Sequence, residues 1–217
     1  MPIFFQQDID HCTKLAVWKI EEGEDFFLQH VPLQREITHP HKRLQHLAGR
    51  YLLQYLFPDF PISLIKIADT RKPYLENEAY HFSISHCSDY AAAIVSSTKR
   101  VGVDIEVPSV KVQKIMHKFL HEEEQQMFDR EASNNQPANG MNIEKLTLLW
   151  NAKEAVFKWW SFGNVDFSEM IRLQPFSLQP YGMIEGAFVS DRILPLQLHY
   201  KIFDGVSLAW IANDLRQ

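Results

Sequence analysis

Two acidic side chains alternate with apolar ones in the segment Val101–Val107. On a β-strand successive side chains point to opposite faces, so Gly102, Asp104 and Glu106 would share one face. A rise of ~3.3 Å per residue places the two carboxylates about 7 Å apart. Like charges at this spacing repel unless a cation lies between them, and Mg²⁺ prefers oxygen ligands of this kind. The same alternation is typical of a strand with one solvent-exposed face, so the segment alone leaves both interpretations open.

A second group of polar and charged residues has helical spacing. Trp150, Glu154 and Lys158 stand at i, i+4 and i+8 in a segment that predicts a helix from Leu146 to about Ser161. These three side chains therefore share one helical face. Taken alone, the Glu–Lys pair indicates no more than an ordinary intrahelical pair, worth about 0.2–0.5 kcal/mol.

Basic residues occur at helical spacing in two further places. Arg43 and Arg50 lie seven residues apart in a helix predicted from near Thr38 to Phe57. Pro40 suits its first helical position, and a proline follows its end. Two aligned arginines can grip a phosphate, although solvated arginines fit the same pattern. After Pro108 a helical segment carries three lysines on one side, which is either a solvated face or a docking face for an acidic partner: Lys111, Lys114 and Lys118.

Composition limits the classes of protein to consider. The 217 residues carry a net charge of −5 and no run of Lys and Arg, which argues against a nucleic-acid-binding protein. Apolar segments stay shorter than the ~18 residues of a membrane span, and the N-terminus does not resemble a signal peptide. Two cysteines form neither a zinc cluster nor a disulfide framework. We therefore expect a cytoplasmic protein that contacts neither nucleic acid nor membrane.

The order of the predicted elements suggests the fold class. Helices are segregated from meandering strands, which favours an α+β fold over a βαβ repeat. We expect two similar α+β halves, residues 1–108 and 109–217, that form a pseudodimer. Besides the central segment, the predicted strands are Lys14–Ile20, Ser63–Ile67, His81–His86, Tyr90–Ser96, Met183–Ser190, Leu196–Phe203 and Val206–Ala212, and a helix Glu122–Arg130 precedes a polar loop, Glu131–Met141.

Taken together, these motifs resemble the larger, pseudodimeric 4′-phosphopantetheinyl transferases, the type that activates surfactin synthetase. Four segments occur in the family's order: Lys72–Leu75, Ile84–His86, Val101–Glu106 and Trp150–Lys158. The last two are specific when they occur together at this separation. The resemblance covers roughly residues 40 to 165.

The resemblance implies a reaction and its participants. Members of this family transfer the 4′-phosphopantetheine arm of coenzyme A to a serine of an apo acyl or peptidyl carrier protein and release adenosine 3′,5′-bisphosphate. The reaction depends on Mg²⁺, and the active site is expected in the cleft between the two halves. A chain of pseudodimeric length is expected to act as a monomer.

The resemblance also assigns residues. Asp104, Glu106 and Glu154 would hold Mg²⁺ against the pyrophosphate, which would relieve the repulsion between the carboxylates. Glu154 would also take the proton from the carrier's serine, and Lys158 would offset charge on the phosphates. Gly102 would leave room for the pyrophosphate. The residues expected to bind coenzyme A are Lys72, Ser85, His86, Lys153 and Arg43.

Three positions depart from the family pattern. Arg71 stands where a glycine usually precedes the Lys-Pro pair, so either the turn differs or Arg71 adds a phosphate contact. Cys87 replaces the usual Ser or Thr after the Ser-His pair; it is a free thiol that is either open to oxidation or buried, and we expect burial. His121 replaces the usual capping Ser ahead of Glu124, which makes the start of that helix less certain.

Two other functions fit part of this pattern. One is a different Mg²⁺-dependent phosphotransferase or hydrolase that acts on a nucleotide. The other is a relative that binds carrier proteins without catalysis, although the three acidic residues and the lysine of the pattern are all present.

Overall fold

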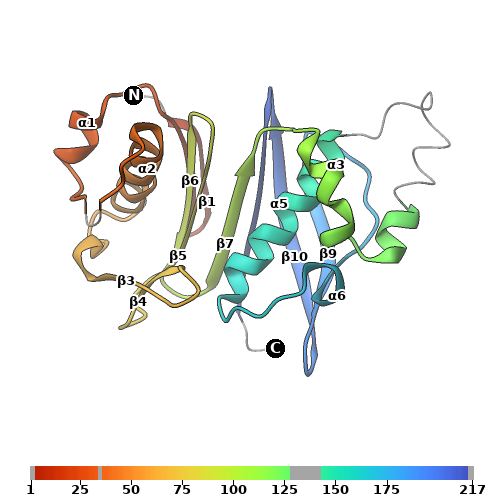
Figure 1. Ribbon diagram of the computed structural model, residues 1–217. Helices are drawn as coiled ribbons and strands as arrows, with labels where there is room; N and C mark the ends of the chain where they lie inside the picture. The colour runs from red at the N-terminus through yellow and green to blue at the C-terminus, as the bar shows by residue number, and fades with distance from the viewer. Residues whose placement is uncertain (1–2, 34–35, 128–142, 215–217) are drawn as a thin grey trace.

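Two antiparallel sheets face each other, and each carries helices on its outer side (Figure 1). The computed structural model describes residues 3–33, 36–127 and 143–214, so the end of the predicted helix Glu122–Arg130 and the polar loop Glu131–Met141 lie outside the described residues. The α+β class is confirmed. Across the molecule the layers are helix, sheet, sheet and helix. Most strands of each sheet come from one half of the sequence.

The first half has a sheet with the order β1-β2-β6-β5, covered by the long helix α2 (Pro40–Leu56). His39 caps α2 by accepting a hydrogen bond from Lys42 N, and Pro40 occupies the first turn. Leu47, Leu52 and Leu53 of α2 are buried against the sheet. The other elements of this half are β1 (Ile3–Asp10), β2 (Thr13–Lys19), α1 (Glu24–Leu28), η1 (Ile62–Leu64), β3 (Ile65–Ile67), β4 (Pro73–Leu75), β5 (His81–Cys87) and β6 (Tyr90–Ser96).

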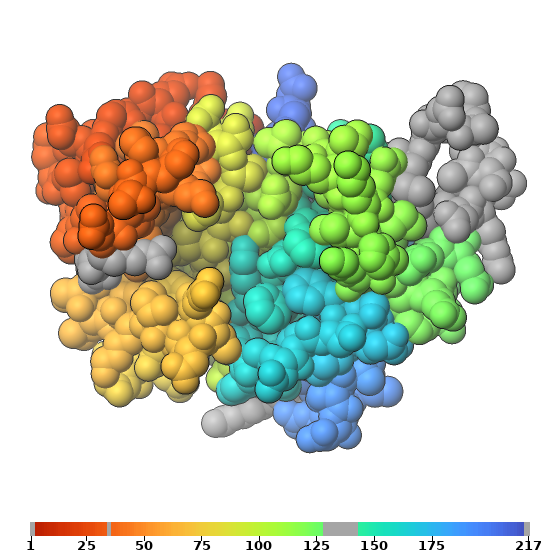
Figure 2. Space-filling view, viewed as in Figure 1, coloured from red at the N-terminus to blue at the C-terminus, as the bar shows by residue number. Residues whose placement is uncertain are grey.

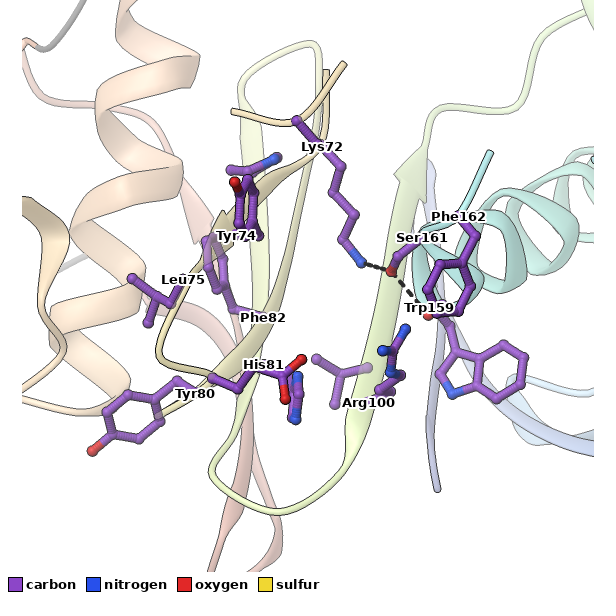
Figure 3. A pocket seen from close by; sticks show the side chains of 14 residues that line it. Lys72, Tyr74, Leu75, Tyr80, His81, Phe82, Arg100, Trp159, Ser161 and Phe162 are labelled. Carbon is purple, nitrogen blue, oxygen red and sulfur yellow. Dashed lines mark hydrogen bonds between the residues drawn. The ribbon is translucent and has the colours of Figure 1, made fainter. Parts of the chain in front are cut away.

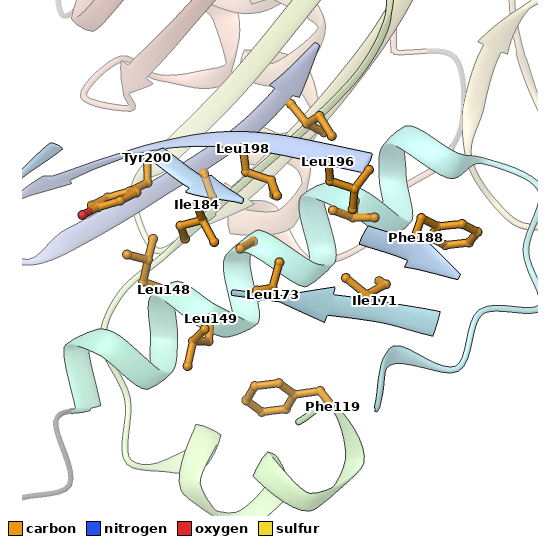
Figure 4. Close-up of a cluster of buried hydrophobic side chains, with 14 of the residues drawn as sticks. Phe119, Leu148, Leu149, Ile171, Leu173, Ile184, Phe188, Leu196, Leu198 and Tyr200 are labelled. Carbon is orange, nitrogen blue, oxygen red and sulfur yellow. The ribbon is translucent and has the colours of Figure 1, made fainter. Parts of the chain in front are cut away.

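The second half has a sheet with the order β7-β11-β10-β9-β8, and helix α5 (Ile143–Trp160) packs across it. Leu148 of α5 meets Ile184, Leu198 and Tyr200 of the strands in one buried cluster (Figure 4). The other elements are β7 (Arg100–Glu106), α3 (Lys111–Ile115), η2 (Met116–Lys118), α6 (Phe167–Met170), β8 (Ile171–Leu173), β9 (Tyr181–Val189), β10 (Ile193–Phe203) and β11 (Val206–Asn213); residues 122–127 are helical.

Strand β7 joins the two halves. It pairs with β11, with Val103 opposite Trp210 and Asp104 opposite Ala209, so it belongs to the second sheet. Val103 N nevertheless donates a hydrogen bond of 3.1 Å to Ser83 Oγ of β5 in the first sheet. The division into residues 1–108 and 109–217 stays a prediction, and a division by sheets would assign β7 to the second half.

Both faces of β7 are buried, which differs from the half-exposed strand that its alternation suggests. Val101, Val103 and Ile105 lie in the core between the two sheets, as expected. The opposite face is covered as well: Asp104 is only 3% exposed, because α5 packs over it. The acidic face of the strand is therefore part of an interior site.

Gly102 makes this close packing possible. A Cβ added at Gly102 would lie 1.9 Å from the carbonyl oxygen of Ala155 and 2.8 Å from Trp159 N, both on the backbone of α5. The expectation that Gly102 leaves room for a pyrophosphate is therefore wrong. Its missing side chain lets the helix backbone approach the strand.

No helix in the described part of the chain is both long and apolar enough to span a membrane.

Candidate active site

Asp104 is the centre of a buried polar cluster between β7, β5 and α5. Its Oδ1 accepts a hydrogen bond of 2.7 Å from Ser85 Oγ and forms an ion pair of 2.6 Å with Lys158 Nζ. Lys158 Nζ also lies 3.0 Å from Ser85 Oγ. The structure thus brings together one residue from each of three of the four segments that the sequence singled out.

Glu106 and Glu154 complete the cluster. Burial raises the pKa of Glu106 to about 7, and the negative charges of Asp104 and Glu154 contribute. Burial likewise raises the pKa of Glu154 to about 7, with the charge of Asp104 adding to it, while Lys158 opposes the shift at both sites. One lysine therefore faces three carboxylates, and the cluster has an excess of negative charge.

The donor set fits a hard divalent cation. Asp104 Oδ2 is buried and has no hydrogen-bond partner among the described residues, although a buried carboxylate oxygen normally has one. Carboxylate oxygens are the ligands that Mg²⁺ prefers. The three carboxylates are less tightly grouped than Asp10, His11 and Cys12, whose ligand atoms lie within 4.8 Å of one another and which form the one such group among the described residues.

Lys72 reaches across from the first half to the end of α5. Its Nζ donates hydrogen bonds to the carbonyl oxygen of Lys158 and to Ser161 Oγ. Figure 2 shows the segment around β3 and β4 in contact with the end of α5 along the seam between the halves. Burial, together with the charges of Arg100 and Lys158, lowers the pKa of Lys72 to about 8.

A cavity of about 230 Å³ lies beside Lys72 and Lys158. Arg71, Lys72 and Lys158 line it, together with apolar side chains such as Phe82 and Phe157. A cavity that combines cations with aromatic walls suits a nucleotide that bears phosphates. We refer to it as the lysine cavity.

Arg71 retains the turn that a glycine would make. Its φ is +64°, in the left-handed region that favours glycine. The backbone here adopts the conformation that glycine favours, and the arginine side chain lines the lysine cavity.

Ser85, His86 and Cys87 lie at the end of β5, with alternating directions. Ser85 is buried and faces Asp104, as described above. His86 is exposed, and partial desolvation and the charge of Lys158 lower the pKa of its imidazole. Cys87 is buried, as expected, and burial raises the pKa of its thiol to about 12. Binding of coenzyme A by Ser85 and His86 stays a prediction.

The position of Lys153 does not agree with the role expected for it. We expected it to bind coenzyme A, but its side chain is completely buried in the second half. Its Nζ donates hydrogen bonds to the carbonyl oxygens of Phe119, Phe167 and Ile171, and pairs with Glu124 Oε2 at 2.6 Å. All of its hydrogen-bonding capacity is used inside the protein, so Lys153 holds segments together and cannot reach a ligand from solvent.

The two arginines of α2 contact other residues of the first half. Arg43 Nε pairs with Glu24 Oε1 at 2.7 Å, and its Nη1 donates to the carbonyl oxygen of Ile37 at 3.0 Å. Arg50 is 6% exposed, beside His46 Nδ1 at 3.1 Å, so it does not share a solvent face with Arg43. The aligned pair that the seven-residue spacing suggested does not form, and a role of Arg43 toward coenzyme A stays a prediction.

Glu124 and His121 confirm a helix start that the sequence left uncertain. His121 N donates to Glu124 Oε2 at 2.8 Å, and Glu123 N donates to His121 Nδ1 at 3.3 Å. This is the reciprocal pattern of a capping box, with an imidazole in place of a hydroxyl. Glu124 therefore both caps the helix and pairs with Lys153.

Sequence reasoning missed two residues at this seam, Arg100 and Ser161. Arg100 begins β7 and lies near Lys72, while Ser161 follows α5 with a φ of +71° and accepts a hydrogen bond from Lys72. The only sequence signal for Ser161 is Gly163, which marks the end of a helix. Arg100 carries no local signal, because only the pairing of the halves brings it to the cavity.

The fold and this cluster define an α+β protein in which a buried strand and a helix bring three carboxylates together with a lysine, and that lysine also lines a cavity. Residues 100–198 match the sequence model of the 4′-phosphopantetheinyl transferase superfamily, a range that includes β7 and α5. Over these residues, slightly less than half of its length, the chain is similar to this superfamily.

Individual relatives agree with this result. The chain is 29% identical over 157 residues to "Enterobactin synthase component D" of Salmonella typhi, over 71% of this chain and 60% of that relative. It is 26% identical over 176 residues to the protein of the same name from Salmonella typhimurium, over 80% of this chain and 68% of the relative. It is 30% identical over 112 residues to "4′-phosphopantetheinyl transferase gsp" of Aneurinibacillus migulanus. That alignment covers 52% of this chain and 44% of the relative, so the three alignments cover 44% to 68% of the relatives' lengths.

Proposed function

We propose that this chain is a Mg²⁺-dependent 4′-phosphopantetheinyl transferase. It transfers the phosphopantetheine arm of coenzyme A to a serine of an apo acyl or peptidyl carrier protein and releases adenosine 3′,5′-bisphosphate. The observation that carries this proposal is the convergence of Asp104, Glu106 and Glu154 on Lys158, within the segment that matches this superfamily.

The carboxylates would hold the metal. Asp104 offers its unpartnered Oδ2, and Glu106 and Glu154 offer carboxylates that burial and mutual repulsion disfavour as bare anions. When bound, Mg²⁺ would neutralise charge on the pyrophosphate of coenzyme A.

The other steps use the chain's own groups. Glu154, whose pKa is raised to about 7, is matched to accept the proton from the carrier's serine hydroxyl near neutral pH. Lys158 Nζ, now shared between Asp104 and Ser85, would stabilise charge that develops on the phosphate being transferred. Lys72 and Arg71 at the lysine cavity would bind the nucleotide part of coenzyme A.

Further expectations belong to this proposal. We expect the protein to act as a monomer in the cytoplasm, where its free cysteines Cys12 and Cys87 would stay reduced. Lys111 and Lys114 of α3, with Lys118, would contact an acidic carrier. Charge reversal at these lysines should raise the KM for the carrier, whereas an unchanged KM would identify a solvated face.

The test is a mass measurement. Apo carrier proteins of the fatty-acid, polyketide and peptide types are incubated with coenzyme A, Mg²⁺ and the purified protein, and each carrier is then weighed. We expect one phosphopantetheine to be added to at least one carrier, and none with Asp104→Ala. If no carrier gains this mass, the proposed function is wrong.

A further inference from the structure

A second cavity, of about 210 Å³, lies along the seam on the other side of Lys72. Tyr74 and Leu75 of β4 and Phe82 of β5 form one wall, and Trp159 and Phe162 from the end of α5 form the other (Figure 3). Lys72 crosses between the walls toward Ser161. We refer to this space as the aromatic cavity.

The aromatic cavity is separate from the carboxylate cluster. Arg100 lines it at the start of β7, whereas Asp104 and Glu106 lie four and six residues further along the same strand. In extended chain these separations correspond to about 13 and 20 Å. A ligand in the aromatic cavity would therefore not touch the metal site that we propose.

Arg100 is the main sign that this cavity takes an anion. Its guanidinium lies 4.7 Å from the centroid of the Phe162 ring, and Nη1 donates to the carbonyl oxygen of Trp160 at 3.4 Å. Among the described residues, no carboxylate lies within 4.0 Å of it to form an ion pair. Burial lowers the pKa of Arg100, which indicates that its charge is held away from water. A half-buried cation of this kind is stabilised by an anionic partner.

The charges around the cavity specify how much negative charge it accommodates. Lys72 and Arg100 are cationic, and Glu78 provides one carboxylate. His81 also lines the cavity, and burial lowers the pKa of its imidazole, so it is neutral at pH 7.5. The net charge of Lys72, Arg100 and Glu78 is one positive charge. A monoanion neutralises it, whereas an aryl phosphate dianion would leave an excess negative charge.

Size and backbone strain agree with a small ligand. A volume of about 210 Å³ is below the ~300–1,000 Å³ of pockets for drug-sized ligands, so a single ring is the appropriate size. Glu78 and Ser161, which both line the cavity, have φ values of +50° and +71°. Non-glycine residues in this region are strained, and such residues cluster at binding sites.

We propose that the aromatic cavity binds a single-ring aromatic monocarboxylate, with its ring against Phe162 and its carboxylate between Arg100 and Lys72. Lys72 lines both this cavity and the lysine cavity, so a ligand here competes for the same ammonium group as the nucleotide. The site therefore couples the binding of an aromatic acid to the binding of coenzyme A, and it goes beyond the proposed transfer reaction.

Binding is tested by calorimetry with benzoate and the full-length protein, without carrier protein. We expect a dissociation constant of roughly 0.1–1 mM, which a ligand of this size can reach. Benzamide, which lacks the charge, and cyclohexanecarboxylate, which lacks the aromatic ring, should each bind at least about fivefold more weakly. If benzoate does not bind, or if cyclohexanecarboxylate binds equally well, the inference is wrong.

Variants locate the site. Phe162→Ala changes a side chain that is 57% exposed and should not disturb folding, and Arg100→Gln removes the charge. Each should weaken benzoate by about tenfold. The matched controls are Tyr181→Ala, at an aromatic residue 74% exposed on β9, and Arg172→Gln, at an arginine paired with Glu169. Equal effects in controls and variants would place benzoate elsewhere and overturn the inference.

A final titration separates this cavity from the coenzyme A site. With increasing coenzyme A, we expect the affinity for benzoate to fall by a limited, few-fold factor, because the cavities share Lys72, Pro73, Phe82 and Ser161 but not Arg100 or Phe162. A loss that grows without limit would mean that benzoate occupies the coenzyme A site, and the inference would fail. The benzoate titration alone does not depend on the transfer reaction, so a failure of the proposed function would be recognised separately.

Discussion

Asp104, Glu106 and Glu154 store electrostatic free energy because they are buried together. Lys158 and Ser85 satisfy one oxygen of Asp104, but a single lysine cannot balance three carboxylates. Burial and repulsion raise the pKa of Glu106 and Glu154 to about 7. Ionisation of these groups therefore lowers the stability of the folded protein. A divalent cation would relieve that cost, which is the residue-level reason to expect one.

Glu154→Gln separates catalysis from folding. Removal of a metal ligand and base should lower transfer by about 10³-fold or more. Because the pKa of Glu154 is raised from 4.5 to about 7 in the folded protein, its ionisation lowers the free energy of unfolding progressively between these pH values, fully above about pH 7 and not at all near pH 4. At pH 8 the variant should therefore equal or exceed the wild-type free energy of unfolding.

Urea unfolding at pH 8 and the carrier mass assay provide both measurements. Glu144→Gln, in the first turn of the same helix, is the matched control and should keep full activity. Normal transfer by Glu154→Gln would remove Glu154 from the site.

At the scale of elements, the register between β7 and α5 decides whether the acidic groups meet. Gly102 allows the two backbones to approach, and the Asn151 side chain donates to Ser207 O and Oγ of β11, both at 2.9 Å. The strand and the helix are therefore held together from both sides of the acidic residues.

Gly102→Ala should be severely destabilising. Its Cβ would overlap the backbone oxygen of Ala155, and backbone cannot move aside as a flexible side chain can. We expect a loss of at least about 3 kcal/mol in the free energy of unfolding, measured by urea denaturation. Gly23→Ala, where nothing lies within 4 Å of an added Cβ, should change stability by less than about 0.5 kcal/mol. A stable Gly102→Ala protein would refute the close approach of α5 to β7.

Lys153→Met should also destabilise the second half. It would leave the Glu124 carboxylate and three carbonyl groups without their shared donor, for a loss of about 3–5 kcal/mol measured by urea denaturation. Glu124→Gln in the same chain should recover part of this loss, because the remaining buried charge is then removed.

A readout of ligand binding distinguishes this structural role from the binding role first expected. The KM for coenzyme A should be unchanged in the folded fraction of Lys153→Met. A stable variant with a raised KM would restore Lys153 as a ligand-binding residue.

At the scale of the whole molecule, Lys72 links the two halves. It extends from the turn before β4 to the carbonyl oxygen of Lys158 and to Ser161 at the end of α5, where the helix dipole favours a cation. The same ammonium group borders both cavities, so ligand binding and contact between the halves depend on one side chain.

The lowered pKa of Lys72 makes this link sensitive to pH. Lys72 releases its proton at about pH 8 in the folded protein and near 10.5 when unfolded. Between these values the unfolded state binds more protons, so stability contributed by this group rises with pH. Compared with Lys72→Met, the wild type should gain about 1–2 kcal/mol between pH 7.5 and 9.5.

The measurement is urea unfolding of both proteins at both pH values, because the difference between them cancels other titrating groups. Lys66→Met is the control: Lys66 lies exposed on β3 and pairs with Glu76. If the difference does not change with pH, Lys72 is not desolvated at the seam.

Local chemistry was predictable because it depends on neighbours in the chain. Alternation predicted the strand that carries Asp104, and helical spacing predicted the helix that carries Glu154 and Lys158. The sequence did not reveal β1, because its burial depends on pairing with β2, nor β8, which is only three residues long. Motif positions also left open which lysine faces a ligand and which is buried.

By itself, the sequence determined the α+β class, the superfamily pattern and the identity of the acidic residues. Only the tertiary structure decided that Lys153 is internal, that Gly102 serves packing, and that the acidic face of β7 is covered. The physical reason is that strand and helix periodicity are set within a few residues, whereas burial is set by contacts between distant segments. The seam at Lys72 and Arg100 shows this most directly, since its walls come from both halves of the chain.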